Sequence, residues 1–477
     1  MKKFIAIILA AILVLSLAAC SGTGSTGTNT EANNTQSTQD NPGGPGGNPP
    51  DGTPPAGGPG GPGGPGGPGG SASDVTYTGS VEITSADSRS SEAYASTTAD
   101  ESALIVNTSD AVTLENITVT KSGDSDGGDS CNFYGLNAAL LVMGGSTTTI
   151  TGGTIESNAF GANGVFSYGG NGGSNGAAGD GTTVIIKDVT ITTTGSGSGG
   201  IMTTGGGVTK AYDLNVTTNG QSSAPIRTDR GGGTVYVEGG TFTSNGLGSP
   251  AIYSTADITV KGAKLISNLS EGVCIEGKNS ITLTDCDLTA NNTQMNGNAS
   301  FLDSIMIYQS MSGDADSGTS AFNMTGGSLT SRNGHVFHVT NTNAIITLEN
   351  VTIVNEDANG VLLSVCADGW SGASNIATLN AVNQSLSGNI LVGSDSTLTL
   401  SPTNGSSFTG AIDGNITNAK GASVSTEVGA VSVTMDSGST WTLTGDTYIT
   451  EFNGDASSII SNGHKLYVNG VALTGTR

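Results

Sequence analysis

The stretch Leu114-Glu-Asn-Ile-Thr-Val119 is the first of nine copies of one six-residue pattern. Each copy opens and closes on an apolar residue, and its third position holds Gly, Asn or Asp. Successive copies begin 23 to 26 residues apart, or 36 and 41 residues apart where the chain carries insertions. The other eight copies are Ile150-Thr-Gly-Gly-Thr-Ile155, Ile186-Lys-Asp-Val-Thr-Ile191, Ala211-Tyr-Asp-Leu-Asn-Val216, Val237-Glu-Gly-Gly-Thr-Phe242, Val260-Lys-Gly-Ala-Lys-Leu265, Leu283-Thr-Asp-Cys-Asp-Leu288, Met324-Thr-Gly-Gly-Ser-Leu329 and Leu348-Glu-Asn-Val-Thr-Ile353.

A fixed period of this length indicates stacked structural units. Within a unit, two β-type stretches meet at the Gly, Asn or Asp corner, and a third short apolar strand precedes them. Those three residue types tolerate the left-handed backbone of a sharp corner. Parallel stacking of the coils buries their inward apolar residues and satisfies their backbone hydrogen bonds. We therefore predict an all-β fold, a right-handed single-stranded parallel β-helix, over residues 74–415.

The repeat fades after residue 415, where Trp441 lies in a stretch of alternating apolar residues. A solenoid needs a cap that covers the core of its last coil. We expect residues 416–477 to form distorted terminal coils and a C-terminal cap.

The nine copies and their corners resemble the pectate-lyase-like β-helix superfamily over residues 75–415. More narrowly, the chain is similar to adhesin-like surface lipoproteins of anaerobic bacteria. The resemblance implies the fold, but a fold of this kind carries many functions and does not itself name an activity.

The N-terminus has the features of an export signal. Two lysines precede an apolar run from Phe4 to Ala19, which is too short for a spanning helix and predicts a signal peptide over residues 1–19. The run ends in Leu17-Ala-Ala-Cys20, which resembles the lipobox of bacterial lipoproteins. That resemblance implies that Cys20 carries lipid such as palmitate, and that the protein is anchored at the extracytoplasmic face of a bacterial cell membrane.

Residues 20–73 have the composition of a disordered tether. Ser, Thr, Asn, Gly and Pro dominate this segment, and it contains no apolar periodicity that could form a core. We expect it to hold the folded part of the chain away from the membrane, which the protein touches only through its lipid.

The charge balance limits the partners. The chain has 15 basic and 39 acidic residues and a formal net charge of −24. Nucleic acid and anionic lipid surfaces are poor partners because phosphate binding needs clustered Lys and Arg, whereas neutral polymers and divalent cations remain plausible. Beyond Cys20, no cysteine spacing suggests zinc or iron–sulfur, and buried thiols are favoured over disulfides. These cysteines are Cys131, Cys274, Cys286 and Cys366.

Alternation with a period of two assigns an outer face to the first strand of each coil. The inward pairs run from Val165/Ser167 to Ile305/Ile307, and insertions within residues 121–136, 169–180, 291–304 and 311–320 flank the same strand. We predict that this outer face is a ligand-contacting surface walled by loops, because tyrosines and charged groups suit sugar rings. Its proposed contacts are Phe166, Tyr168, Arg227, Asp229, Tyr253, Glu276 and Tyr308. The alternative is that these side chains only cover the sheet beneath the loops.

Two further hypotheses concern chemistry. Polysaccharide lyases of the resembled superfamily combine Ca²⁺-binding carboxylates with an Arg or Lys base, roles in which Arg227, Asp229 and Glu276 could serve. The acidic loop with Asp124, Asp126 and Asp129 spaces carboxylates as Ca²⁺ ligands often are, although a solvated acidic loop is the alternative.

We expect a surface lipoprotein that binds a glycan or another extended surface polymer without chemistry. The alternatives are a surface-tethered polysaccharide lyase or glycoside hydrolase, and a structural coat or spacer protein. The hydrolase motifs of the superfamily are not recognisable in this chain, and Gly334-His335 is only a fragment of one.

Overall fold

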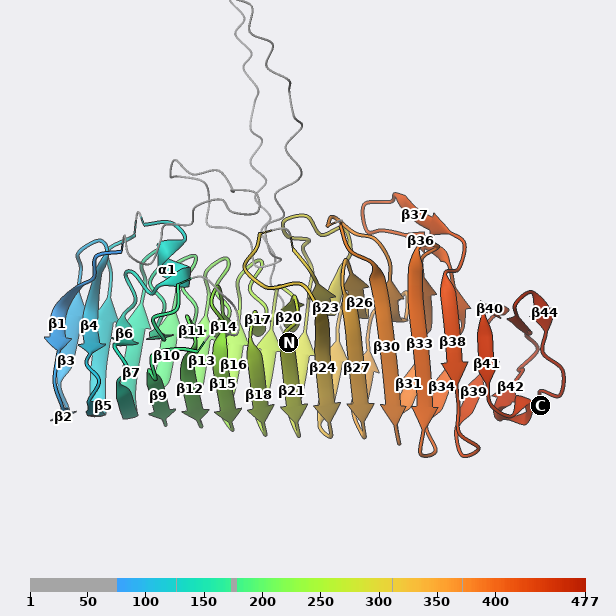
Figure 1. The fold of residues 1–477 in the computed structure, drawn as a ribbon, viewed down its shortest axis with the longest axis horizontal. Helices are drawn as coiled ribbons and strands as arrows, with labels where there is room; N and C mark the ends of the chain where they lie inside the picture. The colour runs from blue at the N-terminus through green and yellow to red at the C-terminus, as the bar shows by residue number, and fades with distance from the viewer. Residues whose placement is uncertain (1–74, 126, 173–177, 311, 371) are drawn as a thin grey trace, which may run out of the picture. The chain divides into compact units, whose positions relative to one another are not determined.

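The computed structural model describes residues 75–125, 127–172, 178–310, 312–370 and 372–477. The predicted signal peptide at 1–19, the predicted lipidation site at Cys20 and the predicted tether at 20–73 lie outside these residues. The described chain is a parallel β-helix, so the predicted fold class is confirmed. Its coils follow one another from β1 to β44, as the blue-to-red order of strands shows (Figure 1).

The first strand of each coil joins a 13-stranded parallel sheet, which we call sheet A. Neighbours in sheet A come from successive coils and pair in register, for example Ile201 with Ile226. The strands of sheet A are β1 (Thr78–Ile83), β4 (Glu101–Asn107), β6 (Leu140–Met143), β8 (Val165–Tyr168), β11 (Ile201–Thr204), β14 (Ile226–Thr228), β17 (Ile252–Ser254), β20 (Val273–Glu276), β23 (Asp303–Tyr308), β26 (His335–Thr340), β29 (Val361–Val365), β32 (Asn389–Val392) and β35 (Ile412–Asp413).

The second and third strands of the coils form a 22-stranded sheet, sheet B. Its strands are β2 (Asp87–Ser90), β3 (Ala93–Ser96), β5 (Ala111–Lys121), β7 (Thr147–Ser157), β9 (Thr183–Lys187), β10 (Thr190–Thr193), β12 (Gly207–Tyr212), β13 (Asn215–Thr218), β15 (Gly233–Glu238), β16 (Thr241–Ser244), β18 (Asp257–Lys261), β19 (Lys264–Ser267), β21 (Ser280–Thr284), β22 (Asp287–Ala290), β24 (Thr319–Thr325), β25 (Ser328–Ser331), β27 (Asn343–Glu349), β28 (Thr352–Asn355), β30 (Asn375–Val382), β33 (Ser396–Thr403), β38 (Ala430–Thr434) and β41 (Glu451–Asn453).

The remaining elements are short. A four-stranded sheet holds β31 (Ser385–Ser387), β34 (Ser407–Thr409), β39 (Thr440–Thr442) and β42 (Ile459–Ile460). An antiparallel pair holds β36 (Asn415–Thr417) and β37 (Ser423–Thr426), and the last sheet holds β40 (Thr447–Ile449), β43 (Leu466–Val468) and β44 (Val471–Ala472). The described helices are α1 (Ser130–Phe133) and the 3₁₀ helix η2 (Ala456–Ser458).

The corners of the repeat have the backbone that the sequence predicts. The third residue of each of the nine copies has a positive φ, from 51° to 69°. At Gly326 a Cβ atom would lie 2.2 Å from Oδ1 of Asp285 in the preceding coil, so this corner accepts only glycine without a shift of that side chain. The corners therefore explain the residue choice at the third position of the pattern.

The apolar ends of the pattern fill one continuous core between the sheets. Seventeen of the eighteen end positions are buried, and Ile353 is partly buried against the same core. Trp441 lies in this core near the C-terminus, where its ring stacks on Phe408 at 5.3 Å and its indole N–H donates to the carbonyl of Gly410 at 3.0 Å. Ile459 and Leu466 continue the core beyond it. The four cysteines after Cys20 are buried, and Cys131, Cys286 and Cys366 are free thiols.

Candidate functional site

The outward positions on sheet A leave the central core, as predicted. Val165, Ile201 and Ile252 belong to the core between the sheets, whereas Phe166 and Tyr253 belong to separate clusters on the other side of sheet A. The predicted alternation of the first strand is therefore confirmed. Tyr253 and Tyr308 lie two coils apart on either side of β20, because Tyr253 pairs with Cys274 and Glu276 pairs with Tyr308.

The expected exposure of this outer face is wrong. Every predicted contact residue is at most 4% exposed, and Tyr253 and Tyr308 are 1% and 0% exposed. Trp370 packs on Tyr308 with ring centroids 5.0 Å apart, and Phe133 lies under the guanidinium of Arg230 at 4.2 Å. The insertions flank the strand as predicted, but they close over its side chains instead of walling an open groove.

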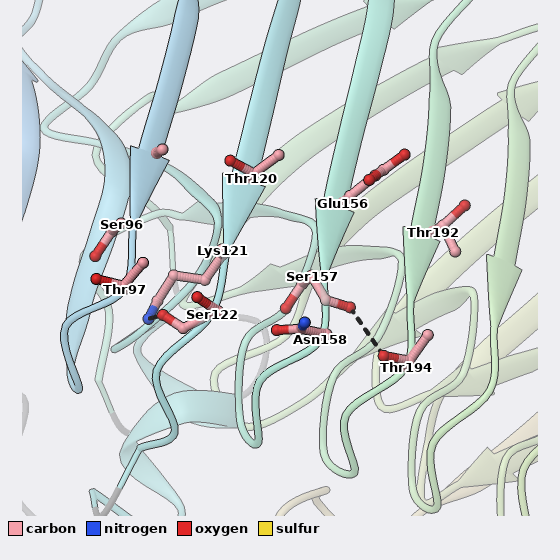
Figure 2. Close-up of a pocket in the computed structure, with 11 residues that line it drawn as sticks. Ser96, Thr97, Thr120, Lys121, Ser122, Glu156, Ser157, Asn158, Thr192 and Thr194 are labelled. Atoms are coloured by element: carbon pink, nitrogen blue, oxygen red, sulfur yellow. Dashed lines mark hydrogen bonds between the residues drawn. The ribbon is translucent and has the colours of Figure 1, made fainter.

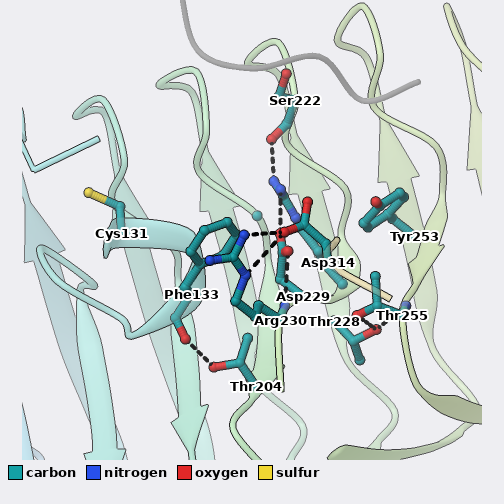
Figure 3. Close-up of polar contacts among 12 residues, drawn as sticks. Cys131, Phe133, Thr204, Ser222, Thr228, Asp229, Arg230, Tyr253, Thr255 and Asp314 are labelled. Atoms are coloured by element: carbon teal, nitrogen blue, oxygen red, sulfur yellow. Dashed lines mark hydrogen bonds and ion pairs between the residues drawn. The ribbon is translucent and has the colours of Figure 1, made fainter. Parts of the chain in front are cut away.

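A buried ionic network lies beneath these loops (Figure 3). Arg227 and Asp229 form an ion pair at 2.9 Å with both side chains at most 5% exposed, and Arg230 binds Asp314 at 2.8 Å. Burial raises the pKa of Asp229 to about 7, against the opposite effect of Arg227. Arg227 also donates to the carbonyl of Ser222 at 2.7 Å. Through Arg230 and Asp314, the network links the segment around β14 to the loop before β24, which lies far along the sequence.

Glu276 is a fully buried acid at the centre of the second group of predicted site residues. Its carboxylate accepts hydrogen bonds from the hydroxyls of Tyr253 at 2.5 Å and Tyr308 at 3.0 Å, and from the hydroxyl of Ser310. Burial raises its pKa, and the charge of Asp314 raises it further, while these hydroxyls act in the opposite direction. Glu276 therefore organises the tyrosines into a packed polar cluster.

Of the three residues considered for lyase chemistry, Arg227 lies on β14, Asp229 directly follows that strand, and Glu276 lies on β20, two strands along sheet A. Arg227, Asp229 and Glu276 are 3%, 3% and 0% exposed, and each has partners within the protein. A polymer would reach them only if the covering loops moved. In the described conformation the arrangement supports packing and ion pairing.

A second buried chain of hydrogen-bonding groups crosses sheet A further along the helix, and the sequence did not single it out. Nδ1 of His338 and Nδ1 of His335 each lie 2.7 Å from the hydroxyl of Ser364, and Nε2 of His338 lies 3.4 Å from Asp368. Burial and the neighbouring His338 lower the pKa of His335 to about 3. Phe301 packs on both imidazoles and Ser364 is fully buried, so this serine is not presented to a substrate.

The described carboxylates of the acidic loop have different surroundings. Asp124 is exposed and accepts the backbone N–H of Phe160 at 2.8 Å, Asp129 stands at the start of α1, and Asp126 lies outside the described residues. Over the described parts of residues 75–477, no three His, Cys, Asp or Glu side chains are grouped to hold a metal.

A shallow polar hollow lies at the ends of β5, β7 and β10 (Figure 2). It has a volume of about 280 Å³ and is lined mostly by serine and threonine residues, together with the acid Glu156 and the amide Asn158. Lys121 also lines it, but its ammonium group is held by the carbonyls of Thr98, Ser122 and Gly123 at 2.7 to 2.9 Å. The hollow offers hydrogen-bonding groups but no aromatic ring for a ligand to stack on.

The solvent face of sheet B carries the aromatic surface that the sequence reasoning assigned to sheet A. Tyr212 on β12 and Tyr236 on β15 are partly exposed, with ring centroids 6.0 Å apart. The ammonium of Lys187 lies 5.4 Å from the ring of Tyr212, and that of Lys261 lies 5.5 Å from the ring of Tyr236. We call this region the tyrosine surface. It comprises Lys187, Lys210, Tyr212, Tyr236, Glu238 and Lys261.

Strand pairing aligns the tyrosine surface into two rows. Lys187, Tyr212, Glu238 and Lys261 are direct partners across β9, β12, β15 and β18, and Lys210 is the direct partner of Tyr236. Neighbouring strands lie about 4.8 Å apart, so the first row is about 14 Å long. The signal for these residues was present in the sequence, because period-two alternation in the second strand also points them outward.

The described residues contain no helix that is both long and apolar enough to cross a membrane. Comparison of the chain with protein-family models, with curated proteins and with solved structures gives no significant match in any of the three.

Proposed function

We propose that this protein is a cell-surface lipoprotein that binds an extended polysaccharide, without chemistry, on the tyrosine surface of sheet B. The observation that carries the proposal is the partly exposed pair Tyr212 and Tyr236, with lysines on both sides of it. Large rings that remain at a flat polar surface are typical of binding sites, because burying them elsewhere would stabilise the fold more.

The chemistry of the surface matches a sugar chain. The apolar faces of sugar rings stack on aromatic rings, and the hydroxyls bond to ammonium and carboxylate groups such as Lys210 and Glu238. A row of about 14 Å accommodates several sugar units of an extended chain. The exposed lysines also offset neighbouring acidic groups in a protein whose formal net charge is −24.

The sequence of residues 1–73 supports a location at the cell surface. The resemblance of the Cys20 segment to a lipobox supports lipid anchoring at the extracytoplasmic face of a bacterial membrane. The polar segment 20–73 would let the β-helix reach a polymer beyond the lipid headgroups. An adhesin-like role at the cell surface combines this anchoring with polymer binding.

A surface-tethered lyase is the second candidate, favoured by the gathering of Arg227, Asp229 and Glu276 on one face of sheet A. It requires the loops over that face to open. A spacer or coat protein without a ligand is the third candidate.

One experiment separates the three functions. The purified protein is assayed against a panel of neutral and acidic polysaccharides, both for binding and for the release of reducing or unsaturated ends. We expect saturable binding to at least one polysaccharide without new ends. New ends would favour an enzyme, and the absence of binding across the panel would favour a spacer.

A further inference from the structure

Three buried polar side chains meet where an insertion loop joins sheet A. Glu271 lies just before β20, Asn292 lies in the loop after β22, and Asp303 begins β23. Their exposed fractions are 2%, 1% and 1%. Two carboxyl groups and an amide are therefore removed from water together, which is costly unless they are compensated.

The three groups are direct neighbours. The amide Nδ2 of Asn292 donates to the backbone carbonyl of Asp303 at 3.1 Å, and the Asn292 side chain also bonds to Glu271. The hydroxyl of Ser270 donates to Glu271. Burial raises the pKa of both acids, and the charge of Glu271 raises the pKa of Asp303 further.

Two oxygens of this cluster have no hydrogen-bond partner in the part of the chain that the structure describes. Oδ1 of Asp303 and Oδ1 of Asn292 are buried, and neither has a hydrogen-bond donor among the described residues. Buried oxygens in native proteins are almost always satisfied, so orphaned ones indicate a bound water or ion. A bound ion would explain both the buried oxygens that lack a hydrogen-bond donor and the burial of two acidic groups.

Among the described residues, no cationic side chain forms an ion pair with either acid. Within the described ranges, neither Glu271 nor Asp303 forms an ion pair. His335 is the strand partner of Asp303, but its pKa is lowered to about 3, so its imidazole is neutral at physiological pH. His338 is engaged with Asp368.

We propose that Glu271, Asn292 and Asp303 bind one Ca²⁺ ion that fastens the insertion loop 291–304 to sheet A. The donors are all oxygens, as a hard cation requires, and two carboxylates match a double positive charge. Ca²⁺ accepts irregular sets of carboxylate, amide and carbonyl oxygens, whereas Mg²⁺ demands near-octahedral geometry and retains its water. This site is distinct from the acidic loop at Asp124 and from the tyrosine surface.

Calcium binding by the full-length protein tests the proposal. Protein stripped with EDTA is titrated with Ca²⁺ in a calorimeter and melted with and without Ca²⁺ or Mg²⁺. We expect one ion per chain and a higher melting temperature with Ca²⁺ but not with Mg²⁺. Because loss of an outer-shell partner alone weakens metal affinity by about 10- to 100-fold, Asp303→Asn should weaken Ca²⁺ binding by at least about 100-fold.

Two variants control for misfolding and for Ca²⁺ binding at the acidic loop. Asp303→Asn should melt in EDTA no lower than the wild type in EDTA, because it removes a buried charge, so lost binding would not reflect misfolding. Asp124→Asn should bind Ca²⁺ like the wild type. The proposal is overturned if wild-type protein binds no Ca²⁺ and its melting temperature responds only to pH, since the acids would then share a proton. It is also overturned if Asp124→Asn, rather than Asp303→Asn, removes binding.

Discussion

The hydroxyl of Tyr253 donates a 2.5 Å hydrogen bond to the carboxylate of Glu276 on the next strand of sheet A, with both side chains at most 1% exposed. This contact indicates that Tyr253 packs within the protein instead of contacting a ligand. Tyr253→Ala should lower the free energy of unfolding by about 3–5 kcal/mol, because it opens a cavity and removes a donor from a buried acid.

The matched control for that substitution is Tyr236→Ala, which truncates a partly exposed ring and should change the free energy of unfolding by about 0.5 kcal/mol or less. Denaturant melts of the two variants measure the difference. Equal stability of Tyr253→Ala and wild type would contradict the enclosed outer face of sheet A.

Stability should fall as pH rises through the weakly acidic range. Burial raises the folded-state pKa of Glu276 above its ordinary value of 4.5, and that of Asp229 to about 7. The folded state then retains protons that the unfolded state has already lost. The contribution is complete below about pH 4 and is lost as pH rises toward 7 and above. Glu276→Gln should flatten this dependence in melts between pH 4 and 8, whereas Glu115→Gln on an exposed corner should not.

An acidic residue in the core of the coils should be poorly tolerated. On β9, Ile186 points into the core between the sheets and is fully buried, whereas its neighbour Ile185 points outward and is partly exposed. Ile186→Asp should cost several kcal/mol of unfolding free energy, because it buries a charge without a partner. Ile185→Asp should cost less than about 1 kcal/mol. Similar losses in both variants would contradict the inward register of β9.

Anchoring should depend on a single thiol. Cys20→Ala should prevent lipidation and release the protein to the medium, whereas Ser21→Ala should leave it in the membrane fraction. Fractionation after a high-salt wash measures this. Retention of the Cys20→Ala protein in the washed membrane would argue against the lipoprotein assignment.

The repeat predicted the fold and the alternation of the first strand because both depend on local rules. The apolar residues at the ends of the pattern face the core, and a positive φ at the third position favours Gly, Asn or Asp. Asn116, Asp188 and Gly239 all have that backbone. These constraints act within one coil, so a single sequence reveals them.

The solvent exposure of the outward side chains could not be predicted from the sequence in the same way. Tyr253 and Tyr212 both alternate outward from their strands, but one is buried and the other is partly exposed. The difference lies in loops without periodicity, which contact sheet A across large sequence separations, as Arg230 and Asp314 do. Strand β12 is joined to β13 by only two residues, so no insertion can cover Tyr212 from that corner. The Glu271, Asn292 and Asp303 cluster likewise depends on how loop 291–304 packs.

A binding isotherm tests whether the tyrosine surface binds polysaccharide. The polysaccharide that binds wild-type protein best is titrated into Tyr212→Ala, Tyr236→Ala and the double variant, with Tyr448→Ala/Tyr467→Ala as control. The control removes another surface pair, whose rings stack at 4.7 Å near the C-terminus. Each substitution at the tyrosine surface should weaken binding by about 1–3 kcal/mol without lowering the melting temperature, and the control should bind normally. Polysaccharide binding at the tyrosine surface would be contradicted if the Tyr212→Ala/Tyr236→Ala protein bound as tightly as the wild type. It would also be contradicted if only the control variant lost binding.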